Sequence, residues 1–353
     1  MPDLILHPDL QSAGPADIER TVYGQEFDLW TSRACDAAAI PAEVWSRAAA
    51  LVCYHEVRID AALLDRLPSC RVVVRAGVGF DNIDLQAAGT RGIAVCNTPD
   101  YGTTDVADHA IALTLNILRG ISAYDGHVFA DPAGGWDFSL VPTVRRLSTQ
   151  TFGVVGLGRI GTATALRAKA IGMRVAFFDP YRPTGTELSL GLERAASLHE
   201  LLGMADVVSL HTPLSDETRH LIGPQAIAAM KAGSVIINTA RGGIVDLAAL
   251  LQALLDDRIA AAGLDVWESE PPNLDHPLLQ AWRKPGSPLR NKLVLTPHAA
   301  FYSPSSLVDL RRKSAMTAAS YLRRGWSRDC VNSHCLDVPK AASRAGHGQD
   351  QQA

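Results

Sequence analysis

The sequence of 353 residues predicts an α/β protein with two doubly wound parallel sheets, each in its own domain. Three observations predict this fold class. Short apolar runs typical of buried strands alternate with helical stretches along almost the whole chain. A glycine-rich turn that joins a strand to a helix lies in the middle of the chain rather than near its start. Apolar residues make up 47% of the sequence, enough for two substantial cores.

The first series of elements precedes the glycine-rich turn. We expect strands at residues 3–6, 27–29, 50–53, 72–74 and 94–96, and helices at residues 42–48 and 59–67. A long helical run at residues 105–120 and a stretch rich in Pro, Gly and Trp at residues 131–146 lead to the turn. The first domain therefore does not contain the turn.

The second series surrounds the glycine-rich turn. We expect strands at residues 154–155, 175–178, 207–210, 235–238, 261–264 and 293–295, and a closing helix at residues 305–325 that returns to the first domain. The expected domains are residues 1–102 plus 302–338, and residues 103–301. Residues 339–353 have no core-forming pattern and are expected to form a disordered tail.

The glycine-rich turn has the spacing of a dinucleotide-binding site. It reads GLGRIG between an apolar strand and a helix. Gly156 permits a tight turn, Gly158 lets backbone N–H groups approach a pyrophosphate, and Gly161 lets the helix pack on the strand. The helix N-terminus favours the anion.

An acidic residue ends the next strand. The Asp179 carboxylate can accept both hydroxyls of an adenosine ribose, and it would repel a 2′-phosphate. NAD is therefore favoured over NADP, although the nearby Arg182 leaves NADP open.

Charge and composition exclude several classes of function. A net charge of −4 gives no field that would attract nucleic acid or an anionic membrane. No apolar run is long enough to span a bilayer, and Met1 is followed by Pro2 and Asp3 rather than by a secretory leader, so we expect a cytoplasmic protein. The cysteines have no metal-binding spacing, so we expect no metal site and reduced thiols at Cys35, Cys53, Cys70, Cys96, Cys330 and Cys335.

Arg241 is the first candidate for chemistry in the second domain. It follows the apolar strand at residues 235–238, and open α/β sheets bind ligands at the carboxyl ends of their strands. Its guanidinium suits a bidentate grip on a carboxylate. The alternative is a surface Arg paired with Asp246.

A carboxylate and a histidine follow the next two strands. Asp265, Glu268 and Glu270 come after the strand at residues 261–264, and His298 after that at residues 293–295. A histidine oriented by a carboxylate forms a general acid/base pair. A lone histidine after a strand is usually structural, but together with an arginine and a glutamate at one sheet edge it favours catalysis.

On these motifs the chain resembles the D-isomer-specific 2-hydroxyacid dehydrogenase family, and within it the branch that contains the C-terminal-binding proteins. The resemblance runs from about residue 4 to residue 337. The stretches that carry it are RAGVGFDNID at 75–84, GIAVCN at 92–97, the glycine-rich turn with DPY at 179–181, LHTPL at 210–214, TARG at 239–242, ESEP at 268–271 and TPHAAFYS at 296–303.

The resemblance implies a flavodoxin-like substrate domain and a Rossmann NAD-binding domain. It implies that His298 is the proton donor and acceptor, Glu270 its orienting partner, and Arg241 the clamp on the substrate. The N–H groups of Val78 and Gly79 would hold the substrate carboxylate. The residues implied for the substrate pocket are Arg75, Gly77, Val78, Gly79 and Phe301.

The same resemblance implies a set of cofactor contacts. Asp265 would face the nicotinamide carboxamide, and His211 with Pro213 would border the adenosine. The residues implied to contact NAD are Val78, Gly156, Gly158, Arg159, Ile160, Gly161, Asp179, His211, Thr212, Pro213, Thr239, Ala240, Arg241, Asp265 and His298.

Two departures from the family pattern affect the choice of substrate. Phe301 stands where the C-terminal-binding branch has a tryptophan that shapes its pocket. Val78 stands where a small or hydroxyl residue is usual, so that wall of the pocket is expected to be more apolar. The preferred acid therefore stays open.

The resemblance implies an NAD-dependent D-2-hydroxyacid dehydrogenase that transfers hydride between NAD(H) and a small 2-keto or 2-hydroxy acid. The alternative is an NADH-gated dimeric scaffold, like a corepressor, with slow residual chemistry. Oxidation of formate or phosphite is a third hypothesis, and Glu270 argues against the formate branch, which replaces this residue. The resemblance also implies a homodimer through residues 105–120, although burial within one domain would equally explain the apolar residues of that helix.

Overall fold

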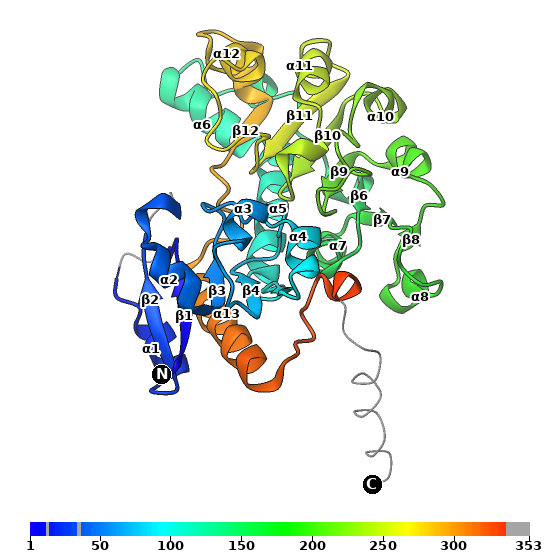
Figure 1. Ribbon diagram of the computed structural model, residues 1–353. Helices are drawn as coiled ribbons and strands as arrows, with labels where there is room; N and C mark the ends of the chain where they lie inside the picture. The colour runs from blue at the N-terminus through cyan, green and yellow to red at the C-terminus, as the bar shows by residue number, and fades with distance from the viewer. Residues whose placement is uncertain (12–13, 34–36, 337–353) are drawn as a thin grey trace. The chain divides into compact units, whose positions relative to one another are not determined.

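The computed structural model describes residues 1–11, 14–33 and 37–336, and the chain divides into two compact units (Figure 1). Unit 1 comprises Met1–Tyr101 and Pro304–Ala353, and unit 2 comprises Gly102–Ser303. The first division falls after residue 101 rather than 102, and the second before residue 304 rather than 302. Cys35 and the tail expected at residues 339–353 lie outside the described residues.

Unit 1 contains a five-stranded parallel sheet. Its strands are β1 (Asp3–His7), β2 (Phe27–Thr31), β3 (Ala48–Cys53), β4 (Val72–Arg75) and β5 (Ala94–Cys96). Their order, β2-β1-β3-β4-β5, is the flavodoxin-like doubly wound order. Every residue of the central strand β3 is buried, which explains why its sequence is a continuous apolar run rather than an alternating one.

Helices pack on the sheet of unit 1. They are α1 (Asp17–Tyr23), α2 (Ala42–Arg47), α3 (Ala61–Leu64), α4 (Leu85–Thr90) and α13 (Pro304–Arg324), with 3-10 turns η1 (Ala37–Ala39) and η6 (Ser333–Cys335). The closing helix α13 packs against β3, β4 and α1. A buried ion pair fixes it there, because the Arg311 guanidinium lies 2.6 Å and 2.8 Å from the two carboxylate oxygens of Glu19 on α1.

Unit 2 contains a seven-stranded parallel sheet. Its strands are β6 (Thr151–Val155), β7 (Arg174–Phe178), β8 (Glu193–Arg194), β9 (Val207–Leu210), β10 (Ser234–Asn238), β11 (Ile259–Leu264) and β12 (Leu293–Leu295). The order β12-β11-β10-β9-β6-β7-β8 is the Rossmann order with one further strand. The predicted fold class is therefore confirmed for both units.

In unit 2, helices α5 and α6 precede the first strand, and α7 to α12 lie between successive strands in sequence. They are α5 (Thr103–Arg119), α6 (Ile121–Ala130), α7 (Arg159–Ala170), α8 (Thr186–Leu190), α9 (Leu198–Met204), α10 (Pro224–Ala229), α11 (Leu247–Leu255) and α12 (Pro277–Arg283), with 3-10 turns η2 (Phe138–Leu140), η3 (Leu147–Thr149), η4 (Gly242–Ile244) and η5 (Pro288–Asn291). Helix α5 crosses the sheet face and packs against α7, β10 and β11.

Burial within unit 2 accounts for the apolar residues of α5. Ala110, Ile111, Leu113 and Ile117 belong to the same core cluster as the strand residue Phe152. The alternative weighed for residues 105–120, a helix buried within its own domain, therefore explains this pattern. A homodimer through this helix stays a prediction.

Two elements differ from the sequence expectation. The helix expected at residues 59–67 is the short α3, which begins where Asp60 accepts a hydrogen bond from Leu63 N–H at 2.9 Å. The edge strand β8 was not expected. Arg194 on β8 lies over the ring of Phe177, 5.0 Å from its centroid, and pairs with Glu187 at 2.8 Å, so long-range contacts rather than local pattern stabilise this strand.

Candidate active site

The glycine-rich turn lies where the chain reverses its direction of winding. Strand β6 is hydrogen-bonded to β7 on one side and to β9 on the other, and open α/β sheets bind ligands at this switch point. Gly156 has a φ of 88°, and a Cβ there would lie 2.9 Å from a Thr212 methyl carbon. A Cβ on Gly161 would overlap the Gly156 carbonyl. Glycine is therefore required at both positions.

Gly158 differs from the other two glycines because its surroundings are open. The nearest atom that a Cβ would meet is an Arg182 nitrogen at 4.0 Å. This residue caps the N-terminus of α7, which begins at Arg159. A turn with open space beside it, at the N-terminus of a helix, fits a pyrophosphate.

Asp179 closes the turn from the end of β7. Its carboxylate accepts hydrogen bonds from Leu157 N–H at 2.8 Å and Tyr181 N–H at 2.9 Å. Arg182 lies 3.7 Å from the same carboxylate. The acidic residue expected to meet a ribose is thus held beside the turn that would hold the pyrophosphate.

Two threonines beyond the neighbouring strands carry buried hydroxyls. Thr212 follows β9 and Thr239 follows β10, and neither hydroxyl has a hydrogen-bond partner within the described part of the chain. A buried hydroxyl without a partner is costly. A bound cofactor at this edge would supply the missing partners, so these residues fit NAD.

His211 is buried and hydrogen-bonded to the strand that precedes it. Its Nε2 lies 2.8 Å from the Ser209 hydroxyl, and burial lowers the pKa of the ring to about 4. The imidazole is therefore neutral at pH 7 and is hydrogen-bonded to β9. A contact between this residue and the adenosine stays a prediction, as does that of Pro213.

The loop after β10 positions Arg241. The Asn238 side chain donates to the Arg241 carbonyl at 2.8 Å and accepts from Ala240 N–H at 3.0 Å, so it shapes the turn from both sides. A Cβ on Gly242 would overlap the backbone at Trp267. The absence of a side chain at Gly242 therefore brings the arginine loop against the loop that carries the glutamates.

His298 and Glu270 form a close pair. His298 Nδ1 lies 2.6 Å from one Glu270 oxygen, and Trp267 N–H donates to the other at 2.8 Å. Burial acts to raise the pKa of Glu270, but these hydrogen bonds and the charges of His298 and Arg241 outweigh it, so its pKa lies below the ordinary value. Both side chains are about one-third exposed, at 35% and 34%. The pair is thus ordered and still open to a ligand.

The second acidic residue of this loop has another partner. Glu268 lies 2.7 Å from His220 Nε2. The structure therefore brings Glu270, and not Glu268, to His298.

Asp265 organises the loop that carries His298. Its carboxylate accepts hydrogen bonds from the Thr296 hydroxyl at 2.6 Å and from Ala299 and Ala300 N–H groups at 2.9 Å each. Its carbonyl accepts from His298 N–H at 2.7 Å. These bonds account for a buried carboxylate without any cofactor, so a contact with the carboxamide stays a prediction.

Three supporting residues were not found from the sequence. Asn238 and Thr296 are described above, and His109 on α5 is hydrogen-bonded to the Thr296 hydroxyl at 3.0 Å. Only their positions in the sequence could have indicated these residues. Asn238 and Thr296 lie at strand ends, and His109 is a polar residue in an apolar helix. The predicted pocket residue Phe301 lies edge-on to the His298 ring, with centroids 6.1 Å apart.

The candidate carboxylate loop lies in unit 1, after β4. The carbonyls of Gly77 and Val78 accept hydrogen bonds from Thr98 N–H at 2.9 Å and the Asn97 amide at 2.8 Å. Within the described residues, the N–H groups of Val78 and Gly79 donate no hydrogen bond. Gly77 has a φ of 149°, and a Cβ there would overlap the Arg75 guanidinium. The loop is thus fixed through its carbonyls, with two N–H donors available.

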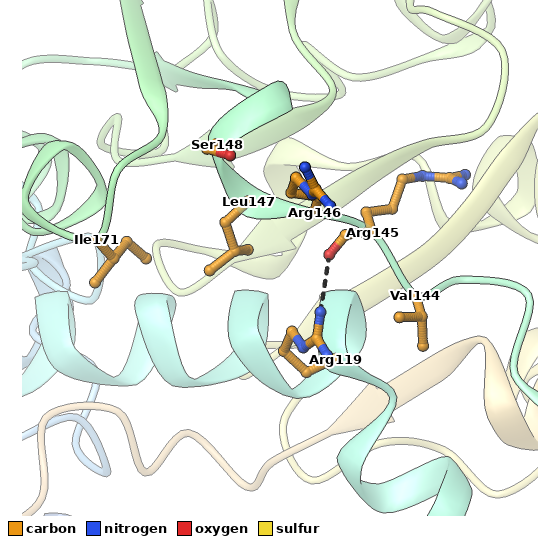
Figure 2. Close-up of a pocket in the computed structure, with 7 residues that line it drawn as sticks. All are labelled: Arg119, Val144, Arg145, Arg146, Leu147, Ser148 and Ile171. Carbon is orange, nitrogen blue, oxygen red and sulfur yellow. Dashed lines mark hydrogen bonds between the residues drawn. The ribbon is translucent and has the colours of Figure 1, made fainter. Parts of the chain in front are cut away.

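A separate hollow of about 490 Å³ lies in unit 2 and is drawn in Figure 2. Its lining residues are Arg119, Val144, Arg145, Arg146, Leu147, Ser148 and Ile171. Arg119 donates to the Arg145 carbonyl at 3.3 Å. Residues 144–148 precede β6, and Ile171 precedes β7. The hollow therefore belongs to the amino ends of these strands, opposite the edge that carries the candidate site.

Within residues 1–11, 14–33 and 37–336, no group of three or more His, Cys, Asp or Glu side chains is arranged to hold a metal ion. No helix in the same residues has the length and apolarity needed to cross a bilayer.

The chain is similar to known proteins over most of its length. Residues 111–300 match the family model described as "D-isomer specific 2-hydroxyacid dehydrogenase, NAD binding domain". A glyoxylate reductase of Korarchaeum cryptofilum is 37% identical over 316 residues, which cover 89% of this chain and 91% of the relative.

Two solved structures are similar over most of the chain. A D-lactate dehydrogenase from Aquifex aeolicus, complexed with NAD and lactic acid, has a TM-score of 0.79 at 27% identity, covering 90% of this chain and 95% of that one. An NADPH-dependent glyoxylate/hydroxypyruvate reductase from Sinorhizobium meliloti, in complex with NADP and malonate, has a TM-score of 0.80 at 29% identity, covering 94% and 97%.

Proposed function

The chain belongs to the D-isomer-specific 2-hydroxyacid dehydrogenase family, and we propose that His298, Glu270 and Arg241 perform its chemistry. It is an NAD-dependent oxidoreductase that acts on the CH–OH group of a 2-hydroxy acid. The observation that carries the residue assignment is the contact of 2.6 Å between His298 and Glu270 at the carboxyl edge of the nucleotide-binding sheet.

Proton transfer is the role that we assign to His298. Glu270 accepts a hydrogen bond from Nδ1, so the opposite ring nitrogen, Nε2, exchanges a proton with the substrate oxygen. In ketoacid reduction the imidazolium donates this proton, and in hydroxyacid oxidation the neutral imidazole removes it. The carboxylate holds the ring in one orientation.

Substrate binding is the role that we assign to Arg241 and the loop of unit 1. The guanidinium of Arg241 can bind the carbonyl and carboxylate oxygens of a 2-ketoacid, and it stabilises the negative charge that develops on the keto oxygen. The N–H groups of Val78 and Gly79 bind the carboxylate, with Arg75 as a second cation. Gly77 shapes this loop, and Phe301 borders the reacting carbon.

NAD(H) supplies the hydride acceptor or donor when it is bound. We propose that the turn from Gly156 to Gly161, with Arg159 and Ile160, holds the pyrophosphate, and that Asp179 holds the adenosine ribose. The remaining contacts would come from the neighbouring strand ends. These are Val78, His211, Thr212, Pro213, Thr239, Ala240, Arg241, Asp265 and His298.

A panel of ketoacids tests this assignment. The relatives named above act on glyoxylate and D-lactate, so the panel begins with glyoxylate and pyruvate and adds hydroxypyruvate, 2-ketobutyrate and phenylpyruvate. NADH oxidation is expected to exceed about 1 s⁻¹ on one of these acids and to fall on the order of 10²-fold in His298→Ala, with NADH binding nearly intact. Unchanged turnover in that variant would remove His298 from the mechanism.

A homodimer is part of this proposal. Phe129, Trp136 and Phe138, in and after α6, are 89%, 81% and 89% exposed. Large exposed aromatic side chains on neighbouring segments are typical of an interface. Sedimentation of the protein at micromolar concentration with NAD present measures its oligomeric state. A sedimentation coefficient that corresponds to a monomer would exclude the homodimer.

The finer resemblance to the C-terminal-binding branch stays a prediction. The relatives reported above are reductases and dehydrogenases by name. Phe301 also differs from the tryptophan of that branch. The scaffold function and the cytoplasmic location likewise remain expectations from the sequence.

A further inference from the structure

A pair of cysteines lies in unit 1, on elements far apart in the sequence. Cys96 ends the edge strand β5, and Cys330 lies in the segment that follows α13. The two residues form an isolated antiparallel bridge, so the C-terminal segment runs beside the edge of the sheet. The described cysteines, including these two, are free thiols.

The hydrogen bonds around this bridge define its geometry. Val331 N–H donates to the Val95 carbonyl at 2.8 Å, and Asn97 N–H donates to the Asp329 carbonyl at 3.2 Å. These bonds flank the two cysteines, which therefore form a non-hydrogen-bonded antiparallel pair. Directly opposite residues in such a pair have Cα atoms about 4.5 Å apart. This separation lies within the range that a disulfide spans.

The two side chains also influence each other, because the pKa of each thiol responds to the other sulfur. The buried Asn332 fixes the segment, since its amide side chain accepts from Val95 N–H at 2.7 Å and donates to the Ile93 carbonyl at 3.0 Å. Its oxygen also accepts a hydrogen bond from the Cys330 thiol at 3.4 Å. The backbone and a neighbouring side chain thus hold Cys330 beside Cys96.

We propose that Cys96 and Cys330 are an oxidation site that forms a reversible disulfide in the presence of a peroxide. Cys330 is partly exposed whereas Cys96 is fully buried, so the peroxide reaches Cys330 first. The Cys330 thiolate attacks a peroxide oxygen, the O–O bond breaks, and an alcohol or water leaves. The Cys96 sulfur then attacks the sulfenic acid and expels water. Two thiols and one peroxide give one disulfide, one water and one alcohol, or two waters from hydrogen peroxide.

The environment of the pair assigns the two roles. The neighbouring Cys96 side chain lowers the pKa of the Cys330 thiol, while Cys330 and then burial raise the pKa of Cys96. The thiolate therefore resides on the more exposed sulfur, where its charge costs less. The deeply buried Cys53 and Cys70 differ, because burial raises the pKa of both thiols and keeps them protonated.

Oxidation of the full chain by hydrogen peroxide tests the proposal. Peptide mapping is expected to give a Cys96–Cys330 cross-linked peptide that dithiothreitol removes. Cys96→Ser and Cys330→Ser are each expected to abolish it. Cys335→Ser is the matched control, since Cys335 is also partly exposed but bonds to Gln86 at 3.4 Å, and the cross-link is expected to persist. A cross-link at another pair, or over-oxidised Cys330 with no cross-link, would overturn the proposal.

A measurement on the unaltered chain covers the case in which a serine variant fails to fold. Brief treatment with iodoacetamide at pH 7 is expected to modify Cys330 before Cys96, Cys53 and Cys70, and prior oxidation is expected to protect it. Equal labelling of Cys330 before and after peroxide treatment would contradict a disulfide at this site.

Discussion

His298 takes its position from Asp265 through the backbone. The His298 N–H donates to the Asp265 carbonyl at 2.7 Å, while the Asp265 carboxylate holds the residues on either side of the histidine. His298 has a φ of 51°, a left-handed conformation that a residue other than glycine adopts at a cost. The hydrogen bonds to Asp265 are what hold the histidine in this conformation.

Asp265→Asn is expected to lower kcat on the order of tenfold and to change the KM for the ketoacid much less. The amide nitrogen cannot accept from Ala299 or Ala300, so the loop and the imidazole shift together. The pH profile of kcat is expected to change shape, which a purely structural loss would not produce.

Asp246→Asn is the matched control for this variant. Asp246 caps α11 by accepting hydrogen bonds from the Ala248 and Ala249 N–H groups at 3.0 Å each, and within the described residues it is not bonded to the His298 loop. Because Asn caps a helix about as well as Asp, this substitution is expected to change stability by less than about 1 kcal/mol and to leave the pH profile unaltered. An unaltered profile in Asp265→Asn as well would show that this carboxylate does not position the histidine.

Asp179→Asn is expected to narrow the preference for NADH over NADPH about tenfold. The change removes the negative charge that repels a 2′-phosphate but leaves one oxygen to accept a backbone N–H. The ratio of kcat/KM for the two cofactors is the measurement. Arg182→Gln serves as the comparison, because it removes the cation 3.7 Å from Asp179 and should act in the opposite direction. An unchanged ratio in Asp179→Asn would contradict the assigned ribose contact.

The sequence predicted the strands better than the side-chain partners. Strands β9 and β12 begin and end at the expected residues because parallel buried strands are short apolar runs with clear ends. The parallel order then brings Arg241, Glu270 and His298 to one edge, because all three follow strands that are neighbours in the sheet. Topology alone thus predicts much of the site.

The supporting contacts could not be predicted in this way. Nothing local indicates that Asn238 bonds to the Arg241 carbonyl, or that Glu268 turns to His220 while Glu270 turns to His298. These choices depend on how two loops pack against each other, at a point where Gly242 removes a side chain. The short helices α8 to α12 were missed for a similar reason, since packing rather than intrinsic propensity stabilises helices of this length.

Arg311→Met is expected to lower the free energy of unfolding of the chain by about 3–5 kcal/mol, because it leaves the Glu19 carboxylate buried without its partner. Chemical denaturation monitored by circular dichroism measures this change. Arg312→Met is the matched control: Arg312 is the next residue on α13, is exposed, and pairs with Asp309 at 3.4 Å, so its loss should cost less than about 1 kcal/mol. Equal effects of the two substitutions would show that the buried pair contributes no more than a surface pair.

His7 is expected to make the stability of unit 1 depend on pH. Burial, opposed by the Glu19 charge and assisted by that of Arg311, lowers the pKa of His7 to about 4 from an ordinary value of 6.5. The unfolded chain therefore binds more protons than the folded chain between these two values. The neutral ring contributes fully to the free energy of unfolding above pH 6.5. This contribution falls as the pH drops toward 4, by on the order of 3 kcal/mol.

His7→Gln is expected to reduce this loss, because a glutamine does not titrate and can still bond to the Tyr23 hydroxyl, which lies 2.8 Å from His7 Nε2. Urea denaturation at several pH values between 4 and 7 measures the slope in each protein. Part of the slope should remain in the variant, since burial lowers the pKa of His211 to about 4 as well. The control is His199→Gln, at an exposed position on α9. If His7→Gln and His199→Gln retain the same slope as the unaltered chain, protonation of His7 is not what destabilises the protein in mild acid.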